Sequence, residues 1–576
     1  MENLKNILWL CLAGLLLAAL PVAAGQIVVS TPSFALVLDA PVGGELRYLY
    51  YGTGLSEDDL RQMNVAGTCH HVAYPSYGIG WPGESALRVR HADGVIATRL
   101  YVQDVEVRQE PDAMLTLVKL KDCVYPFYVN LCYKAYRDVD VIETWAEFSH
   151  SEKTPVTLLQ FASSYLPLRR GDVWLSSLYG GWGNEARLLQ EPLKPGIRLI
   201  KNIDGVRNSH TAHAEVMFSL DGKPQENTGR TIGAALCYTG DYRLKINTDD
   251  GDYHHFFAGM DEEGASFRLK KGKVFRTPPL ALTYSEEGLG GASRNFHKWG
   301  RKHKLANGDK PRKILLNSWE GVYFDINQKD MEQMMADIAL MGGELFVMDD
   351  GWFGNKHPRD IDSAGLGDWV VNPKKLPDGI AGLLRDAAKH NIGFGIWIEP
   401  EMINTRSELY EKHPDWVMKV PGQDFITARG GTQAVLDLTN PQVRDFIFYT
   451  VDTLLARYPE IEYIKWDANM PVLNHGSVHL DKDEQSHLSI LYHQGFEDVC
   501  RRIRRKYPDV TIQACASGGG RVNYGYLPYF DEFWTSDNTP CNAFISSGER
   551  PISFLLSLWD RISALRPTIR RIAACP

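Results

Sequence analysis

The sequence lacks the signatures of several functional classes. It has 71 Asp and Glu residues against 62 Lys and Arg residues, and the net charge of −9 is spread over 576 residues. The one dense basic cluster, residues 501–506, ends a predicted helix, where cations are favoured, so we expect no nucleic-acid partner. The nine cysteines form no C-x-x-C pair and no metal-ligand spacing. We therefore expect neither a metal nor a cofactor, and the sequence does not pair the cysteines into disulfides.

Beyond residue 24 the sequence also lacks an apolar run long enough to cross a membrane. The N-terminus has a charged start at Lys5, an apolar stretch over residues 7–20 and small residues at 22–24. This pattern is typical of a secretory signal peptide over residues 1–24, with an uncleaved anchor as the alternative. We expect a secreted or periplasmic protein that has no membrane attachment after signal cleavage.

The chain is too long for one compact domain, and its character changes near residue 287. From 26 to 286, runs of β-branched and aromatic residues alternate with turn sequences such as Asp221-Gly222. This pattern predicts an antiparallel β-sandwich, followed by a helical linker at 287–310. The strand-like runs include residues 114–119, 139–148, 231–238 and 267–284.

From residue 311 to 540, predicted strands and helices alternate, which is typical of βα units around a parallel sheet. Two of the helices have a clear apolar face: Met331, Met334, Met335 and Ile338 in the helix at 329–341, and Val443, Ile447, Val451 and Leu454 in a helix capped by Asn440. The predicted strands are 314–316, 345–348, 393–398, 463–466, 511–514 and 532–534. A (β/α)8 TIM-type barrel fits best, but only about six of its eight strands are visible.

Each of these six strands ends in a polar or aromatic cluster. In a barrel the strand ends meet on one rim, which carries the catalytic residues. The clusters contain no His-rich metal set, no G-x-S-x-G elbow and no phosphate-binding G-x-G-x-x-G. Carboxylates beside aromatic rings suit glycoside hydrolysis. In that reaction one carboxylate attacks the anomeric carbon, and the other protonates the leaving oxygen and then activates water.

Five of the clusters resemble motifs of glycoside hydrolase family 36, the microbial α-galactosidases. They are Asp349-Asp350-Gly351-Trp352, Trp397-Ile398-Glu399-Pro400-Glu401-Met402, Lys465-Trp466-Asp467, Cys515-Ala516-Ser517-Gly518-Gly519-Gly520-Arg521 and Ser536-Asp537-Asn538-Thr539. The resemblance runs from about residue 30 to Thr539. It is looser in the first half, where residues 71–87 resemble the family's N-terminal β-supersandwich.

The resemblance implies a role for each matching residue. Asp467 would be the nucleophile and Asp537 the acid/base of a retaining enzyme that releases terminal α-D-galactosyl residues from oligosaccharides. Galactose would be bound by Asp349, Asp350, Trp397, Arg429, Lys465, Asn469, Cys515 and Gly518. Glu399 and Glu401 are interpreted as supports behind the site. Two alternatives stay open: Cys515 could be an ordinary buried cysteine, and Arg429 could be a surface residue without a role in binding. A homo-oligomer would also agree with the family.

The resemblance stops after Thr539, and residues 541–576 form an atypical tail without a family pattern. We interpret the break as a truncation or a reading-frame shift near Pro540, with a divergent short variant as the alternative. A sheet of six strands leaves two open edges, which predicts poor solubility and weak activity. Two other functions stay open: an α-N-acetylgalactosaminidase, and an inactive, truncated galactoside-binding fragment.

Overall fold

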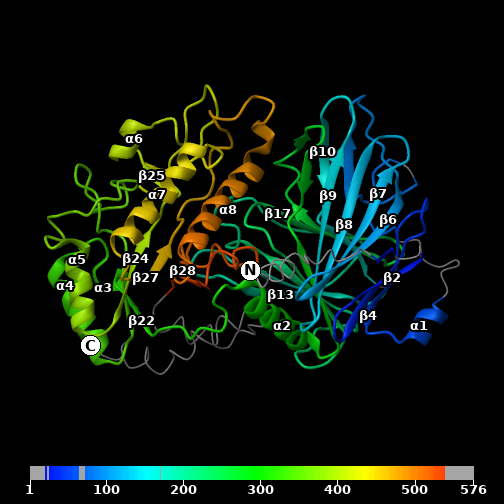
Figure 1. The fold of residues 1–576 in the computed structure, drawn as a ribbon, viewed down its shortest axis with the longest axis horizontal. Coiled ribbons are helices and arrows are strands. Elements are labelled where there is room, and N and C mark those ends of the chain that lie inside the picture. Colours follow the sequence, from blue (N-terminus) through cyan, green and yellow to red (C-terminus); the bar gives the residue numbers. More distant parts are fainter. Residues whose placement is uncertain (1–19, 22–24, 64–71, 79, 169, 539–576) are drawn as a thin grey trace, which may run out of the picture.

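The computed structural model describes residues 20–21, 25–63, 72–78, 80–168 and 170–538. The predicted tail at 541–576 lies outside these residues, as does the predicted signal peptide except for residues 20–21. Those two residues form β1 (Leu20–Pro21), which pairs with β6 (Leu100–Gln109). Figure 1 shows a strand-rich half beside a half in which helices alternate with strands. Within the described residues no helix combines the length and the apolar character needed to cross a membrane.

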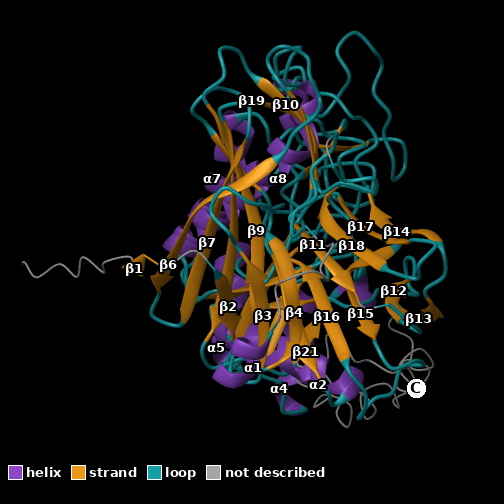
Figure 2. Ribbon diagram, turned by 90° about the vertical axis from the view of Figure 1, so that its right-hand side faces the viewer, coloured by secondary structure: helices purple, strands orange, loops and turns teal. Residues whose placement is uncertain are grey.

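An 11-stranded antiparallel sheet is the frame of the strand-rich half. Its longest strands are β6, β7 (Ala113–Asp122) and β8 (Phe127–Tyr136), which pair along their lengths. Figure 2 shows β6 and β7 side by side. Successive residues of a strand face opposite sides. One row of apolar side chains, such as Val118 and Val129, packs into the main core, and Leu115 and Leu117 form a smaller buried cluster on the other face. The other strands are β9 (Ile142–His150), β12 (Trp174–Tyr179), β13 (Arg187–Pro192), β15 (Ala212–Ser219), β16 (Thr231–Leu236), β20 (Val274–Arg276) and β21 (Leu280–Ser285).

Three smaller antiparallel sheets share one hydrophobic core with this frame. The first contains β11 (Ser164–Leu168), β14 (Gly196–Asn202), β17 (Tyr242–Thr248) and β18 (His254–Met260). The second contains β5 (Leu87–Arg90), β10 (Val156–Phe161) and β19 (Phe267–Leu269), and the third contains β2 (Gln26–Ser30), β3 (Phe34–Asp39) and β4 (Arg47–Thr53). A short helix, α1 (Glu57–Gln62), follows β4.

The prediction of one strand-like run over residues 267–284 is wrong in detail. The chain forms three short strands there, and each has different partners: β19 pairs with β10, β20 with β9, and β21 with both β9 and β16. A turn closed by the bond from Lys273 N to Lys270 O separates the first two. Pro278 and Pro279 precede β21, and proline cannot donate a ladder hydrogen bond. The segment is therefore strand-forming, but the turn and the two prolines divide it into three strands.

The second half is an incomplete barrel, as predicted. Helix α2 (Gly288–Trp299) and π-helix η1 (Gly300–Lys304) precede it. Within the described residues its parallel sheet has six strands, in the order β22 (Leu315–Asn317), β23 (Leu345–Met348), β24 (Gly393–Ile398), β27 (Ile461–Trp466), β28 (Thr511–Ala514) and β29 (Glu532–Phe533). The longer helices between them are α4 (Gln328–Leu340), α5 (Gly379–Lys389), α7 (Pro441–Arg457) and α8 (Leu488–Lys506). The short elements are α3 (Trp319–Val322), α6 (Glu408–Lys412), η2 (Gln485–His487) and a hairpin of β25 (Met402–Asn404) and β26 (Gln433–Val435). The sequence pattern predicted none of these short elements.

The predicted cap and apolar face of α7 are present with one change. The Asn440 side chain accepts a hydrogen bond from Gln442 N, and Pro441 occupies the first turn. The buried face ends at Leu455, whereas the predicted Leu454 is only half-buried. In α4, Met331, Met335 and Ile338 are buried as predicted, and Met334 is half-buried.

A candidate active site at the strand ends

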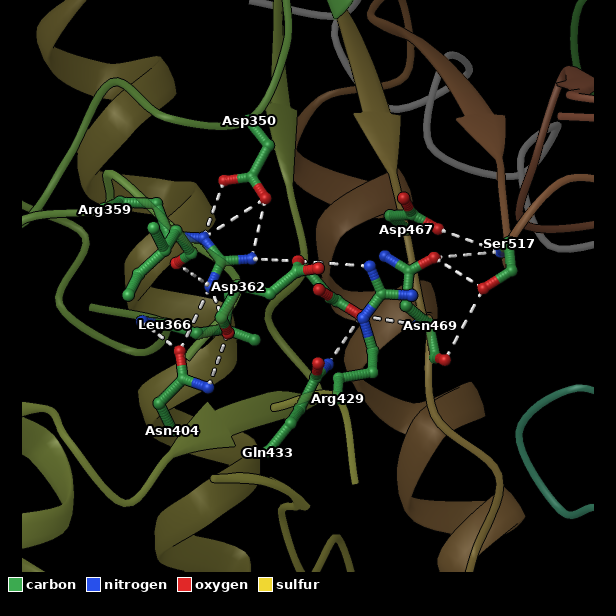
Figure 3. A network of polar contacts seen from close by, with 12 residues as sticks. Asp350, Arg359, Asp362, Leu366, Asn404, Arg429, Gln433, Asp467, Asn469 and Ser517 are labelled. Atoms are coloured by element: carbon green, nitrogen blue, oxygen red, sulfur yellow. Dashed lines mark hydrogen bonds and ion pairs between the residues drawn. The ribbon is translucent and has the colours of Figure 1, made fainter. Parts of the chain in front are cut away.

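The predicted site residues gather at the carboxyl ends of the parallel strands. Trp397 in β24 lies level with Lys465 in β27, and Lys465 lies level with Gln513 in β28. Asp349, Asp467 and Cys515 follow β23, β27 and β28 directly, so parallel register brings them to one rim. Figure 3 shows Asp350 with Arg359 on one side of this rim and Asp467 with Asn469 and Ser517 on the other.

Asp467 is buried and held in place by three donors. Trp397 Nε1 donates to its Oδ2 at 3.1 Å, and the backbone N–H groups of Ala468 and Ser517 donate to its Oδ1 at 2.8 and 3.4 Å. Burial by itself would raise the pKa of the carboxyl. The Lys465 ammonium and the surrounding donors outweigh burial, and the pKa lies below its ordinary value. Asp467 is therefore ionised at neutral pH.

Lys465 is the central cation of the site. Its Nζ donates to Asp349 Oδ2 at 2.8 Å and lies 4.7 Å from the ring centroid of Trp534. Burial opposes its charge, but Asp349 and Asp467 raise the pKa of the ammonium above its ordinary value. Asn317 Nδ2 also donates to Asp349 Oδ2, at 2.6 Å. The carboxylate of Asp349 is thus fixed between a cation and an amide.

Asp350 forms a two-pronged ion pair with Arg359. Arg359 Nε donates to Oδ1 at 3.0 Å and its NH2 donates to Oδ2 at 2.7 Å. Both side chains are almost fully buried. Arg359 also donates to the carbonyl oxygens of Asp362 and Ala364 and to Asn404 Oδ1. This network gives Asp350 a fixed orientation at the rim.

Asp537 sits beyond β29, where two indole groups donate to its two oxygens. Trp182 Nε1 lies 2.9 Å from Oδ2 and Trp534 Nε1 lies 3.2 Å from Oδ1. Burial raises the pKa of Asp537 and the negative charge of Asp467 raises it further. The two indole donors and Lys465 oppose this rise without cancelling it. The two carboxyls therefore have pKa values that are shifted in opposite directions.

The turn after β28 lies between these two carboxyls. Ser517, with a φ of 48°, donates through Oγ to Asn469 Oδ1 at 2.8 Å. Gly518 has a φ of 80°, and a Cβ there would lie 2.7 Å from both Asp537 N and Glu185 Oε1. Only glycine fits this position, because any side chain would displace Asp537. The Cys515 thiol is buried beside Asp467 and its pKa is raised, mainly by burial.

The remaining predicted residues occupy different positions around the rim. The Trp397 ring is 1% exposed, so it meets the site through its indole nitrogen, not through an open face. Arg429 donates from NH2 to Asp362 Oδ1 at 3.1 Å, and its side chain is about one-third exposed. Its φ of 45° is unusual for a residue with a side chain and is typical of strained functional loops.

Two family models together match most of the chain between residues 44 and 547. The glycosyl hydrolase family 36 N-terminal domain matches residues 44–270, and the melibiase family matches residues 274–547. The chain belongs to glycoside hydrolase family 36. It is 34% identical over 436 residues to alpha-galactosidase AgaA of Geobacillus stearothermophilus, and 33% identical over 492 residues to alpha-galactosidase C of Emericella nidulans. These matches take in 75% and 81% of this chain but 59% and 64% of the relatives, so the chain spans less than two thirds of their length.

Solved structures of the family share the fold. AgaA of Geobacillus stearothermophilus in complex with stachyose superposes with a TM-score of 0.84 at 29% identity, over 90% of this chain and 76% of that one. The galactosidase domain of the alpha-galactosidase-sucrose kinase AgaSK gives 0.85 at 28% identity, over 93% and 78%. The sandwich and the described part of the barrel in this family 36 chain therefore have the same fold as the matching parts of its relatives.

Glu399 and Glu401 lie behind the site of the family 36 chain and are fully buried. Glu399 Oε1 accepts hydrogen bonds from Asn469 N and from Gln433 Nε2, the latter at 3.1 Å. Its Oε2 has no hydrogen-bond partner within the described residues. Burial and the nearby charge of Asp467 raise the pKa of Glu399 to about 8, against the attraction of Arg429. Glu399 is therefore a neutral acid at pH 7.

The stability advantage of the Glu399→Gln variant over the native protein should grow as the pH rises. Below about pH 4.5 Glu399 carries its proton in both states and contributes nothing to the pH dependence. Between about pH 4.5 and 8 the folded state keeps a proton that the unfolded state has released, so native stability falls with rising pH. Glutamine removes this cost, which is ~1.4 kcal/mol per unit of pKa. We expect the difference in melting temperature between variant and native protein to grow by several degrees from pH 5 to 8.5, and a constant difference would contradict it.

The sequence patterns missed three residues that complete the rim. Arg359 lies in a loop outside the family motifs, while Trp182 and Glu185 come from the sandwich, between β12 and β13. Glu185 Oε2 accepts from Ser536 Oγ at 2.8 Å. A signal was available in the sequence at Gly181-Trp182-Gly183, where a large aromatic ring lies between two glycines in a turn. Nothing in that local pattern could indicate which strand end it would contact.

Proposed function

We propose that this chain is a retaining exo-glycosidase that hydrolyses terminal α-D-galactosyl residues from galacto-oligosaccharides. The observation that carries the proposal is the pair of opposite pKa shifts at Asp467 and Asp537 on one rim. A retaining mechanism needs one carboxylate that is ionised and one carboxyl that keeps its proton. Membership of family 36 supports the same reaction, as does the similarity to α-galactosidases of a bacterium and a fungus.

The reaction would proceed in two displacements. In the first, an oxygen of Asp467 bonds to the anomeric carbon while the glycosidic bond breaks, and Asp537 gives its proton to the leaving oxygen. In the second, Asp537, now ionised, takes a proton from water as the water oxygen bonds to the anomeric carbon and Asp467 departs. Each displacement inverts the carbon, so α-galactose is released and Asp537 has regained its proton.

Fixed polar groups favour a sugar that carries hydroxyls at defined positions. Asp349, Asp350 and Lys465 are buried and oriented by their own ion pairs, so they would lose their fit to a sugar that lacks the matching hydroxyl. Structures of the AgaA relative hold stachyose and raffinose. These observations support α-galactosyl oligosaccharides as the substrate class for this chain.

Hydrolysis of p-nitrophenyl α-D-galactoside by the purified 576-residue chain, followed by proton NMR, tests the proposal. We expect the α-anomer of galactose to appear first and the β-anomer only later by mutarotation. Appearance of the β-anomer first would overturn the retaining mechanism. Preference for the α-N-acetylgalactosaminide would favour that substrate instead. Binding of galactose without turnover of either substrate would show a galactoside-binding fragment.

A further inference from the structure

A loop of the sandwich is attached to the ends of barrel strands β28 and β29. The loop spans residues 180–186, between β12 and β13. Asn538 Nδ2 donates to Gly183 O at 3.0 Å, and Ser536 Oγ donates to Glu185 Oε2 at 2.8 Å. Gly519 N approaches Glu185 Oε1 at 3.5 Å. These contacts hold the loop in place without help from the side chain of Trp182.

The attachment of the loop places Trp182 in contact with Asp537. Its Nε1 donates to Oδ2 at 2.9 Å, across 355 residues of sequence. An indole N–H can only donate, so it stabilises the ionised carboxylate more than the neutral acid. The ring itself is 69% exposed. Core packing therefore does not explain the residue, and its replacement should cost the fold little.

We infer that Trp182 is a positioning residue supplied by the sandwich, and that its indole N–H orients the acid/base carboxyl of Asp537. The other groups that act on Asp537 come from the barrel: Lys465 on β27, Asp467 directly after β27, Trp534 after β29, and the Cys515 thiol after β28. The sandwich thus contacts the carboxyl of Asp537 through the hydrogen bond from Trp182. The catalytic consequence rests on the proposed function, whereas the hydrogen bond itself does not.

Trp182→Phe removes the donor and keeps an aromatic ring. The pKa of Asp537 should rise because its ionised form loses a stabilising bond, and the alkaline limb of kcat/KM should move up by roughly one pH unit. At pH 7, kcat/KM for raffinose should fall about tenfold, because a sugar leaving group needs the proton of a well-oriented acid. For 2,4-dinitrophenyl α-galactoside, whose leaving group departs without a proton, the loss should stay below about threefold.

Trp174→Phe is the matched control. Trp174 Nε1 also donates to an aspartate, Asp172 Oδ1 at 3.2 Å, in the same domain but at the surface of the large sheet. This variant should retain the native pH profile and the native ratio between the two substrates. Equal behaviour of the two variants, in pH profile and in substrate ratio, would overturn the inference.

The indole NMR signal of Trp182 tests the hydrogen bond without requiring turnover. In protein labelled with ¹⁵N-tryptophan, the indole peak absent from the Trp182→Phe spectrum belongs to Trp182. We expect this peak to shift with pH in the native chain and to lose that shift in Asp537→Asn. The inference would be refuted if the chemical shift of this peak did not change with pH in the native chain, or if it changed equally in Asp537→Asn. If the native chain turns over no α-galactoside, the proposed function fails and this spectrum alone decides the role of Trp182.

Discussion

Asp467→Asn should lower kcat/KM for p-nitrophenyl α-galactoside by at least about 10⁴-fold, because the covalent intermediate can no longer form. The change is nearly isosteric, and the amide oxygen can still accept from Trp397 Nε1, which donates to Asp467 at 3.1 Å. The fold should therefore survive, and circular dichroism and the melting temperature check this. Asp360→Asn is the control: it removes another carboxylate of the same domain, paired with Lys375 and largely exposed, and activity should be unchanged.

Azide distinguishes the nucleophile from the acid/base. In Asp467→Ala, azide can enter the vacated space and attack the anomeric carbon once, giving β-galactosyl azide. In Asp537→Ala, azide attacks the galactosyl-enzyme from the face where water normally arrives, giving α-galactosyl azide. The two products have opposite anomeric configurations, which proton NMR resolves. α-Galactosyl azide from Asp467→Ala would reverse the assigned roles, and activity within tenfold of the native chain would remove Asp467 from the mechanism.

Arg521→Met should destabilise the fold by about 3–5 kcal/mol, the usual cost of leaving a buried charge without its partner. Arg521 and Glu401 are both almost fully buried and contact each other at 2.8 Å through two nitrogen–oxygen pairs. Arg521 Nε also donates to Val206 O in the sandwich at 3.1 Å, so the side chain ties the two halves together. The melting temperature should fall by several degrees.

Two further variants separate charge burial from loss of volume. Arg521→Met with Glu401→Gln removes both charges and should recover part of the lost stability. Lys389→Met breaks an exposed pair with Glu332 and should cost below about 1 kcal/mol. A loss for Arg521→Met as small as that for Lys389→Met would show that the buried pair contributes little to the fold.

The sequence could specify features that depend on near neighbours. Helix α7 begins at Pro441 because the Asn440 cap lies beside it, and its buried face follows from a helical repeat. The polar clusters at strand ends could be placed on one rim, because parallel strands of a barrel point the same way. The roles assigned to Asp467, Asp537 and the sugar-binding residues stay predictions until the variants are measured.

Features that join distant segments could not be read in the same way. The breaks within residues 267–284 have local signals, such as Pro278-Pro279. The partners that the three strands take depend on which strands lie nearby, and apolar composition does not encode that choice. The Arg521–Glu401 pair and the Arg359–Asp350 pair likewise require packing that brings separate loops together.

The sequence by itself determined the two-part architecture, the incomplete parallel barrel and the family. These follow from periodicity and from motifs a few residues long. Only the tertiary structure decided that Trp182 of the sandwich meets Asp537, and that the two carboxyls carry opposite pKa shifts. The physical reason is that ionisation depends on burial and on charges within a few ångströms, and these are set when the chain packs, whatever the separation in sequence.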